Sequence, residues 1–112
     1  MRIDKDFSEF YHPLKSTPDL DPLMERIGDA KYVLLGEASH GTHEYYTWRT
    51  EITKRLIKEK GFSFIAVEGD WPDCYKINQW IKDQASEKTI QEILMEFNRW
   101  PTWMWSNWEI IA

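Results

Sequence analysis

The sequence has little cysteine, no excess of positive charge and no long apolar run. Its single cysteine, Cys74, cannot form a disulfide within the chain, which fits a reducing cytoplasm and predicts a packed thiol. With 14 Lys and Arg against 19 Asp and Glu, a basic nucleic-acid-binding surface is not expected. No stretch approaches the roughly 18 apolar residues of a membrane span, and no secretory signal precedes the first apolar run. We therefore expect a cytoplasmic protein that binds neither nucleic acid nor membrane.

A chain of 112 residues with 42% hydrophobic content has room for one small globular domain or for part of a larger one. Residues 1–18 show no clear periodicity, and Pro13 and Pro18 disfavour a helix there. We expect residues 1–18 to form an N-terminal arm. Residues 19–112 are expected to form the α/β portion of a domain that is truncated at its C-terminus.

Several segments have helical signals. Asp21-Pro22 predicts a helix start and Gly28 its end, and the apolar stripe of residues 43–60 ends at Gly61. Within that second helix, Glu51 is spaced to pair with Arg55. Further helices are predicted from Asp70 as a cap, from the capping-box pair Thr89 and Glu92, and after Pro101 near Trp103.

Two apolar runs, residues 31–36 and 62–67, are continuous rather than alternating. This pattern is typical of parallel strands covered on both faces. With the helix between them, they predict one βαβ unit of a parallel sheet flanked by helices. Two strands alone are marginal, so we expect an N-terminal fragment of a larger α/β fold. The missing C-terminal half, or self-association, could complete it.

Acidic residues follow both predicted strands: Glu37 comes after the first and Glu68 after the second. If the strands are neighbours, about 4.8 Å apart, both carboxylates emerge at the edge where α/β folds bind ligands. His40 lies three residues beyond Glu37, and Arg49 lies about two turns into the next helix. This juxtaposition predicts a catalytic site. His40 is the candidate general base, Glu37 and Glu68 orient and polarise it, and Arg49 steadies charge.

Two other chemistries use the same residues. Ser39 lies one residue too far from Gly36 for a nucleophile elbow, so a serine nucleophile is not expected. A metal-dependent hydrolase stays open as an alternative, because His40, His43, Glu37 and Glu68 all offer metal donors. However, the spacing of the two histidines differs from the four-residue spacing usual for helical zinc ligands. We predict neither a metal nor a cofactor.

The blocks LGEASHGTHE at residues 35–44, Trp48-Arg49, VEGDW at residues 67–71, and Phe97 with PTWMW at residues 101–105 resemble those of the erythromycin esterase family. The resemblance extends from about residue 12 to residue 108. It implies a hydrolase that cleaves a small-molecule ester, in known cases the lactone of macrolide antibiotics, and so a role in antibiotic resistance. It also implies that His40 activates water without a metal, in a cleft lined by Glu37, Glu68 and Arg49.

The resemblance also implies what is missing. Family members are several times longer, and a further histidine that is important for activity lies in their later half. An inactive truncated chain that serves only as a folding or interaction module is therefore the second alternative. Four tryptophans, Trp100, Trp103, Trp105 and Trp108, gather near the C-terminus. We expect them to pack against the missing half rather than against a ligand.

Overall fold

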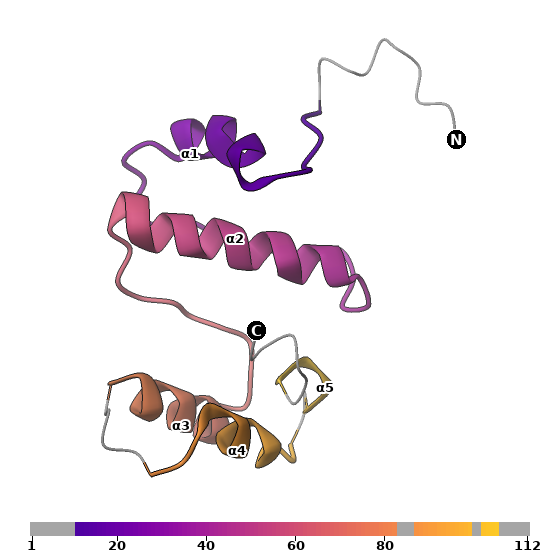
Figure 1. The fold of residues 1–112 in the computed structure, drawn as a ribbon, viewed down its shortest axis with the longest axis vertical. Coiled ribbons are helices and arrows are strands. Elements are labelled where there is room, and N and C mark those ends of the chain that lie inside the picture. The colour runs from indigo at the N-terminus through magenta and orange to yellow at the C-terminus, as the bar shows by residue number, and fades with distance from the viewer. Residues whose placement is uncertain (1–10, 83–86, 100–101, 106–112) are drawn as a thin grey trace. The chain divides into compact units, whose positions relative to one another are not determined.

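The computed structural model describes residues 11–82, 87–99 and 102–105 (Figure 1). Over these residues the chain is helical and divides into two compact units, Met1–Ile65 and Ala66–Ala112. In chain order the elements are η2 (Thr17–Leu20), α1 (Asp21–Ile27), α2 (His43–Lys60), α3 (Trp71–Lys82), α4 (Ile90–Met95) and α5 (Thr102–Trp105). The helix predictions of the sequence are confirmed in each of these places except the short turn η2, which the prolines had argued against.

The first unit joins η2 and α1 to the long helix α2. Leu20 and Met24 are buried on the short helices, and Leu56 is buried on α2. Arg55 of α2 adds a polar link to the same short helices: its Nη1 lies 2.7 Å from Asp21 Oδ1 and 3.2 Å from the carbonyl oxygen of Thr17. The guanidinium of Arg55 thus links α2 to the region of η2 and α1.

The ion pair predicted between Glu51 and Arg55 is wrong. Arg55 instead binds Glu59 through Nε and Nη2, at 2.7 and 2.9 Å, while Glu51 pairs with Lys54. The planar fork of arginine can satisfy one carboxylate with two donors and still reach a second with its remaining nitrogen. These acceptors raise the pKa of Arg55, with Glu59 as the largest cause. Helical spacing allowed both partners, and tertiary contact decided between them.

The second unit is built on the packing of α3 against α4. Ile93, Leu94 and Phe97 are buried in it. The predicted capping box at the start of α4 is confirmed: Thr89 Oγ1 accepts from the backbone N–H of Glu92 at 3.3 Å, and Glu92 Oε2 accepts from the backbone N–H of Thr89 at 2.7 Å. The two reciprocal bonds satisfy helix-end donors that would otherwise lack partners.

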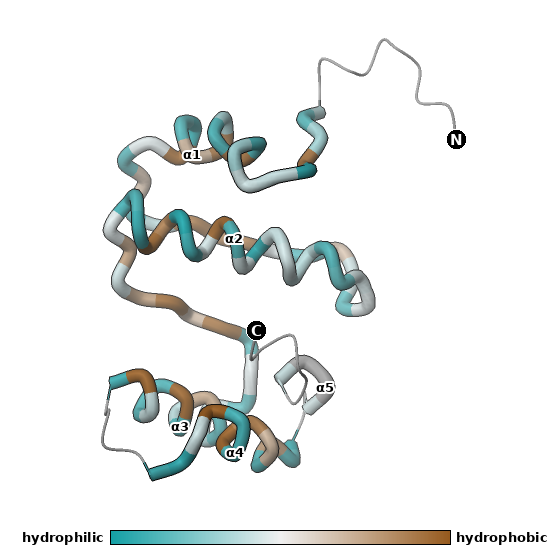
Figure 2. Tube along the Cα trace, viewed as in Figure 1, coloured by the Kyte–Doolittle hydropathy of each residue, from teal (hydrophilic) through white to brown (hydrophobic). Residues whose placement is uncertain are grey.

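The predicted α/β class is wrong. Within the described ranges no residue is assigned to a strand, so the βαβ unit and the parallel sheet are absent there. Residues 31–36 and 62–67 remain apolar connecting segments (Figure 2). Several of their side chains face solvent: Leu34 is 94% and Phe64 79% exposed.

The physical reason lies in how the two kinds of element close their hydrogen bonds. A helix bonds its backbone within one segment, whereas a strand needs another strand beside it. The apolar composition indicated segments suited to a sheet, but composition does not show whether a second strand lies beside each segment to form hydrogen bonds with it. Residues 1–10, which make up most of the predicted arm, lie outside the described residues, and the division at residue 18 stays a prediction.

Candidate functional site

The loop that leads into α2 contains Glu37 and His40, two of the candidate residues predicted from the sequence. Thr42 is extended, with φ −108° and ψ 106°, and its carbonyl oxygen accepts the N–H of Tyr45 at 3.2 Å. The hydroxyl of Ser39 accepts the N–H of Gly41 at 3.2 Å. This bond, between residues two apart, closes a turn of the kind that serine side chains form with the nearby backbone. The Ser39 hydroxyl therefore helps to set the conformation of the loop.

Glu37 and His40 meet across this loop. Glu37 Oε1 lies 2.5 Å from His40 Nδ1, and the Glu37 side chain is 9% exposed while that of His40 is 50% exposed. A buried carboxylate thus holds one ring nitrogen of a histidine that opens to solvent. When Nδ1 carries the hydrogen of this bond, the lone pair of the neutral ring is on Nε2.

Arg49 completes the charge balance of Glu37. It reaches back from α2 so that its Nη2 forms an ion pair with Glu37 Oε2. Among the described residues neither atom has a hydrogen-bond partner elsewhere. A carboxylate removed from water is costly unless it is paired, and Arg49 supplies the opposite charge. One oxygen of Glu37 therefore faces His40 and the other faces Arg49.

Tyr46 is a member of this cluster that the sequence reasoning missed. Its Oη lies 3.2 Å from Glu37 Oε1 and 3.1 Å from the carbonyl oxygen of His40. The guanidinium carbon of Arg49 lies 5.2 Å from the centre of the Tyr46 ring, within the range of a cation–π contact. The signal that could have revealed it was spacing, because Tyr46 and Arg49 are three residues apart and share a helix face.

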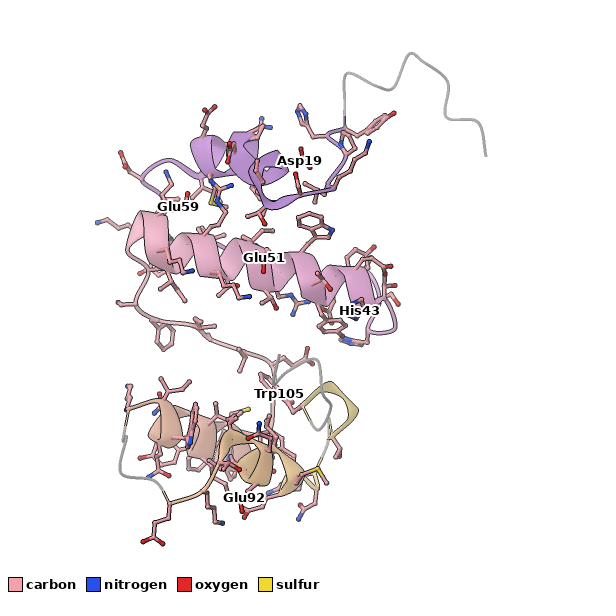
Figure 3. All side chains as sticks on the ribbon, viewed as in Figure 1. Asp19, His43, Glu51, Glu59, Glu92 and Trp105 are labelled. Atoms are coloured by element: carbon pink, nitrogen blue, oxygen red, sulfur yellow. The ribbon has the colours of Figure 1, made fainter. Side chains whose placement is uncertain are left out.

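His43 is the first residue of α2 and lies at the N-terminal end of that helix (Figure 3). Its Nε2 is 3.1 Å from Thr47 Oγ1, one turn along the same helix. Among the described residues, no three His, Cys, Asp or Glu side chains are grouped as metal ligands would be. The described helices also include none that is long and apolar enough to cross a membrane.

Glu68 belongs to the second unit, so its predicted convergence with Glu37 stays a prediction, and the sheet edge on which that prediction relied is not formed by the described residues. The backbone carbonyl of Glu68 accepts a hydrogen bond from Trp105 Nε1 at 3.1 Å. Trp105 also stacks near Phe97, with ring centres 6.1 Å apart. This tryptophan therefore has contacts within its own unit, and the expectation that the C-terminal tryptophans pack against a further part of the fold stays a prediction. Trp100 and Trp108 lie outside the described residues, as does the side chain of Trp103.

Gly69 lies close to side chains of α3 and α5 in the second unit. A Cβ on Gly69 would be 2.5 Å from Cys74 Sγ and 2.9 Å from Trp105 Nε1. Cys74 is partly buried, and burial raises the pKa of its thiol, with Asp73 and Asp70 adding to the rise. Asp70 lies directly before α3, and its carbonyl accepts the N–H of Cys74 at 2.9 Å. The glycine therefore sets the path of the backbone immediately after Glu68.

Comparison with known proteins agrees with the resemblance seen in the sequence motifs. Residues 57–112 match the family described as erythromycin esterase. The chain is also 34% identical over 86 residues to the erythromycin esterase type II of Escherichia coli, a match that covers 77% of this chain. The same match covers 20% of that protein, so the chain corresponds to about a fifth of its length. No solved structure matches the chain significantly. On the family match and this identity, the chain belongs to the erythromycin esterase family.

Proposed function

We propose that this chain contributes the water-activating part of the active site of a carboxylic ester hydrolase. What carries the proposal is the contact between Glu37 Oε1 and His40 Nδ1. Family membership supports the reaction class. The substrate class we propose is a small-molecule ester, such as the lactone of a macrolide antibiotic, and the physiological role is inactivation of such a compound.

In this proposal His40 is the general base and Glu37 orients it. The Nε2 lone pair takes a proton from a water molecule as the water oxygen attacks the ester carbonyl carbon. The tetrahedral intermediate then collapses, the bond to the alkoxide breaks, and the imidazolium returns its proton to the leaving oxygen. Arg49 balances the charge of Glu37 throughout. The products are a carboxylic acid and an alcohol.

Glu68 is proposed as a second acid of the same site, which polarises the water or steadies the imidazolium. Its support is the family match, which spans residues 57–112 and so includes it. The proposal needs no metal ion. The metal-dependent alternative predicts loss of turnover in chelator and recovery on addition of a divalent ion, so activity measured with and without chelator separates the two mechanisms.

The decisive experiment is His40→Ala in an active protein that contains this chain, with macrolide and simple aryl esters as substrates. We expect turnover to fall by about 10²- to 10⁴-fold, the usual contribution of a general base, with little change in melting temperature because the His40 side chain is half exposed. His43→Ala is the matched control, since the His43 ring bonds to Thr47 on its own helix, with Nε2 3.1 Å from Thr47 Oγ1. A variant that loses stability but keeps its turnover would show that His40 is structural.

If no protein containing the chain is active, the second alternative, a non-catalytic folding or interaction module, becomes the better explanation. Circular dichroism and a melting curve of the 112-residue chain test it directly. A chain that gains a cooperative transition only when a partner or a second copy is added would favour that alternative.

A further inference from the structure

Tyr46 contacts the Glu37–His40 loop at two points, one on a side chain and one on the backbone. Its Oη is 3.2 Å from Glu37 Oε1 and 3.1 Å from the His40 carbonyl oxygen. Both of those atoms are acceptors, so the tyrosine must be the donor. A phenol has one hydrogen, which is shared between the two oxygens or alternates between them. The same hydroxyl therefore restrains the backbone of the general base and the carboxylate that orients it.

The helix provides the rigidity that this arrangement needs. Tyr46 lies in the first turns of α2, and side chains in a helix lean toward its N-terminus. Tyr46 is consequently directed at the loop that precedes the helix. Arg49, three residues later, contacts the other oxygen of Glu37 and lies against the Tyr46 ring. Two residues of one helix face thus hold both oxygens of a single carboxylate.

The loop itself is open to solvent. Residues 38–41 are solvent-exposed, and the His40 ring is half exposed. Exposed loops with few buried contacts open at low free-energy cost. A tether to a helix therefore helps to keep the Glu37–His40 geometry populated.

We propose that Tyr46 is a positioning residue that keeps His40 in the tautomer with its hydrogen on Nδ1. It does so by fixing Glu37 Oε1 where it accepts from that nitrogen, which places the ring's lone pair on Nε2. The contribution of Tyr46 to catalysis rests on the proposed function. Its effect on the tautomer of the His40 ring does not depend on that function.

Tyr46→Phe removes one hydroxyl and leaves the ring against Arg49. The matched control is Tyr45→Phe, the same chemical change at the adjacent position, where the side chain is exposed. The readout is a long-range ¹H–¹⁵N spectrum of the histidine rings of the 112-residue chain at a pH where the rings are neutral. It distinguishes the two tautomers of His40 by the pyrrole-like and pyridine-like shifts of Nδ1 and Nε2.

We expect Tyr46→Phe to lower the ratio of the Nδ1–H to the Nε2–H tautomer by roughly two- to tenfold, the range that an ordinary net hydrogen bond corresponds to. Tyr45→Phe should leave the ratio unchanged. On a Glu37→Ala background, Tyr46→Phe should shift the ratio by much less, because the acceptor through which it acts is gone. In an active protein that contains the chain, kcat should fall by a similar factor while KM stays nearly constant.

Equal tautomer ratios for Tyr46→Phe and Tyr45→Phe, with helix content unchanged by circular dichroism, would overturn the proposal. An equal shift from Tyr46→Phe with and without Glu37 would overturn it as well. The two proposals can fail separately. A tautomer shift in Tyr46→Phe together with full turnover in His40→Ala supports the positioning role and refutes the esterase mechanism.

Discussion

Replacing Gly69 by alanine tests whether the backbone after Glu68 is set by close packing in the second unit. The new Cβ would lie 2.5 Å from Cys74 Sγ, 2.9 Å from Trp105 Nε1 and 3.3 Å from Trp105 Cε2. Ordinary carbon contacts begin near 3.4 Å. Neither neighbour gives way easily, because the Cys74 sulfur is only two bonds from the Cα atom of its residue in α3. The Trp105 indole donates to the backbone carbonyl of Glu68 and packs near Phe97.

Overpacking of this kind typically costs about 1–3 kcal/mol. At roughly 4–8 °C per kcal/mol for a domain of this size, the melting temperature should fall by about 5–20 °C. The assay is urea and thermal unfolding of the 112-residue chain, followed by circular dichroism and tryptophan fluorescence.

Gly36→Ala is the matched control, since a Cβ on Gly36 would meet no atom within 4 Å. It should leave stability within about 0.5 kcal/mol of the starting chain. Cys74→Ala removes the nearest obstacle, so the double variant with Gly69→Ala should be less unstable than the sum of the two single variants. A Gly69→Ala chain as stable as Gly36→Ala would refute the close packing and, with it, the path assigned to residues 68–70.

Two further predictions concern ionisation. Hydrogen bonds from Thr89 lower the pKa of Glu92, and a hydrogen bond from Lys88 lowers that of Glu96. Their stabilising contribution is therefore present above the unfolded value of about 4.3 and is lost as pH falls through the folded values. Acid unfolding followed by circular dichroism should begin below about pH 4. Glu92→Gln should make stability depend less on pH in this range. The same loss of stability with falling pH in both proteins would contradict the stabilising role of the Glu92 carboxylate. Burial raises the pKa of Cys74, so at pH 8 iodoacetamide should label this thiol at least several-fold more slowly than in urea. Equal rates in native buffer and urea would show that the thiol is not protected.

Helix positions could be predicted from the sequence because the signals for a helix are local. Gly61 adopts a φ of 72° at the end of α2, a conformation that favours glycine, and it ended the predicted helix at the same place. The capping box at Thr89 likewise depends on residues three apart. In patterns of this kind, both partners of each hydrogen bond lie within the same short segment.

Strands and ion pairs could not be predicted with the same success, because their partners lie elsewhere in the chain. Residues 31–36 and 62–67 have strand composition but no strand beside them among the described residues. Arg55 had an acceptable partner in Glu51, yet it binds Glu59 and Asp21 instead. In both cases the local pattern allowed more than one outcome.

The sequence by itself determined the helices, the family, and the position of Glu37 and His40 in one loop, since three residues cannot separate two side chains by far. Only the tertiary structure showed that two side chains of α2 bind Glu37 in that loop. Arg49 binds Oε2, while Tyr46 and His40 both bind Oε1. The physical reason is that a turn is closed by its own residues, whereas the angle at which a helix leaves that turn decides which of its side chains come back to it.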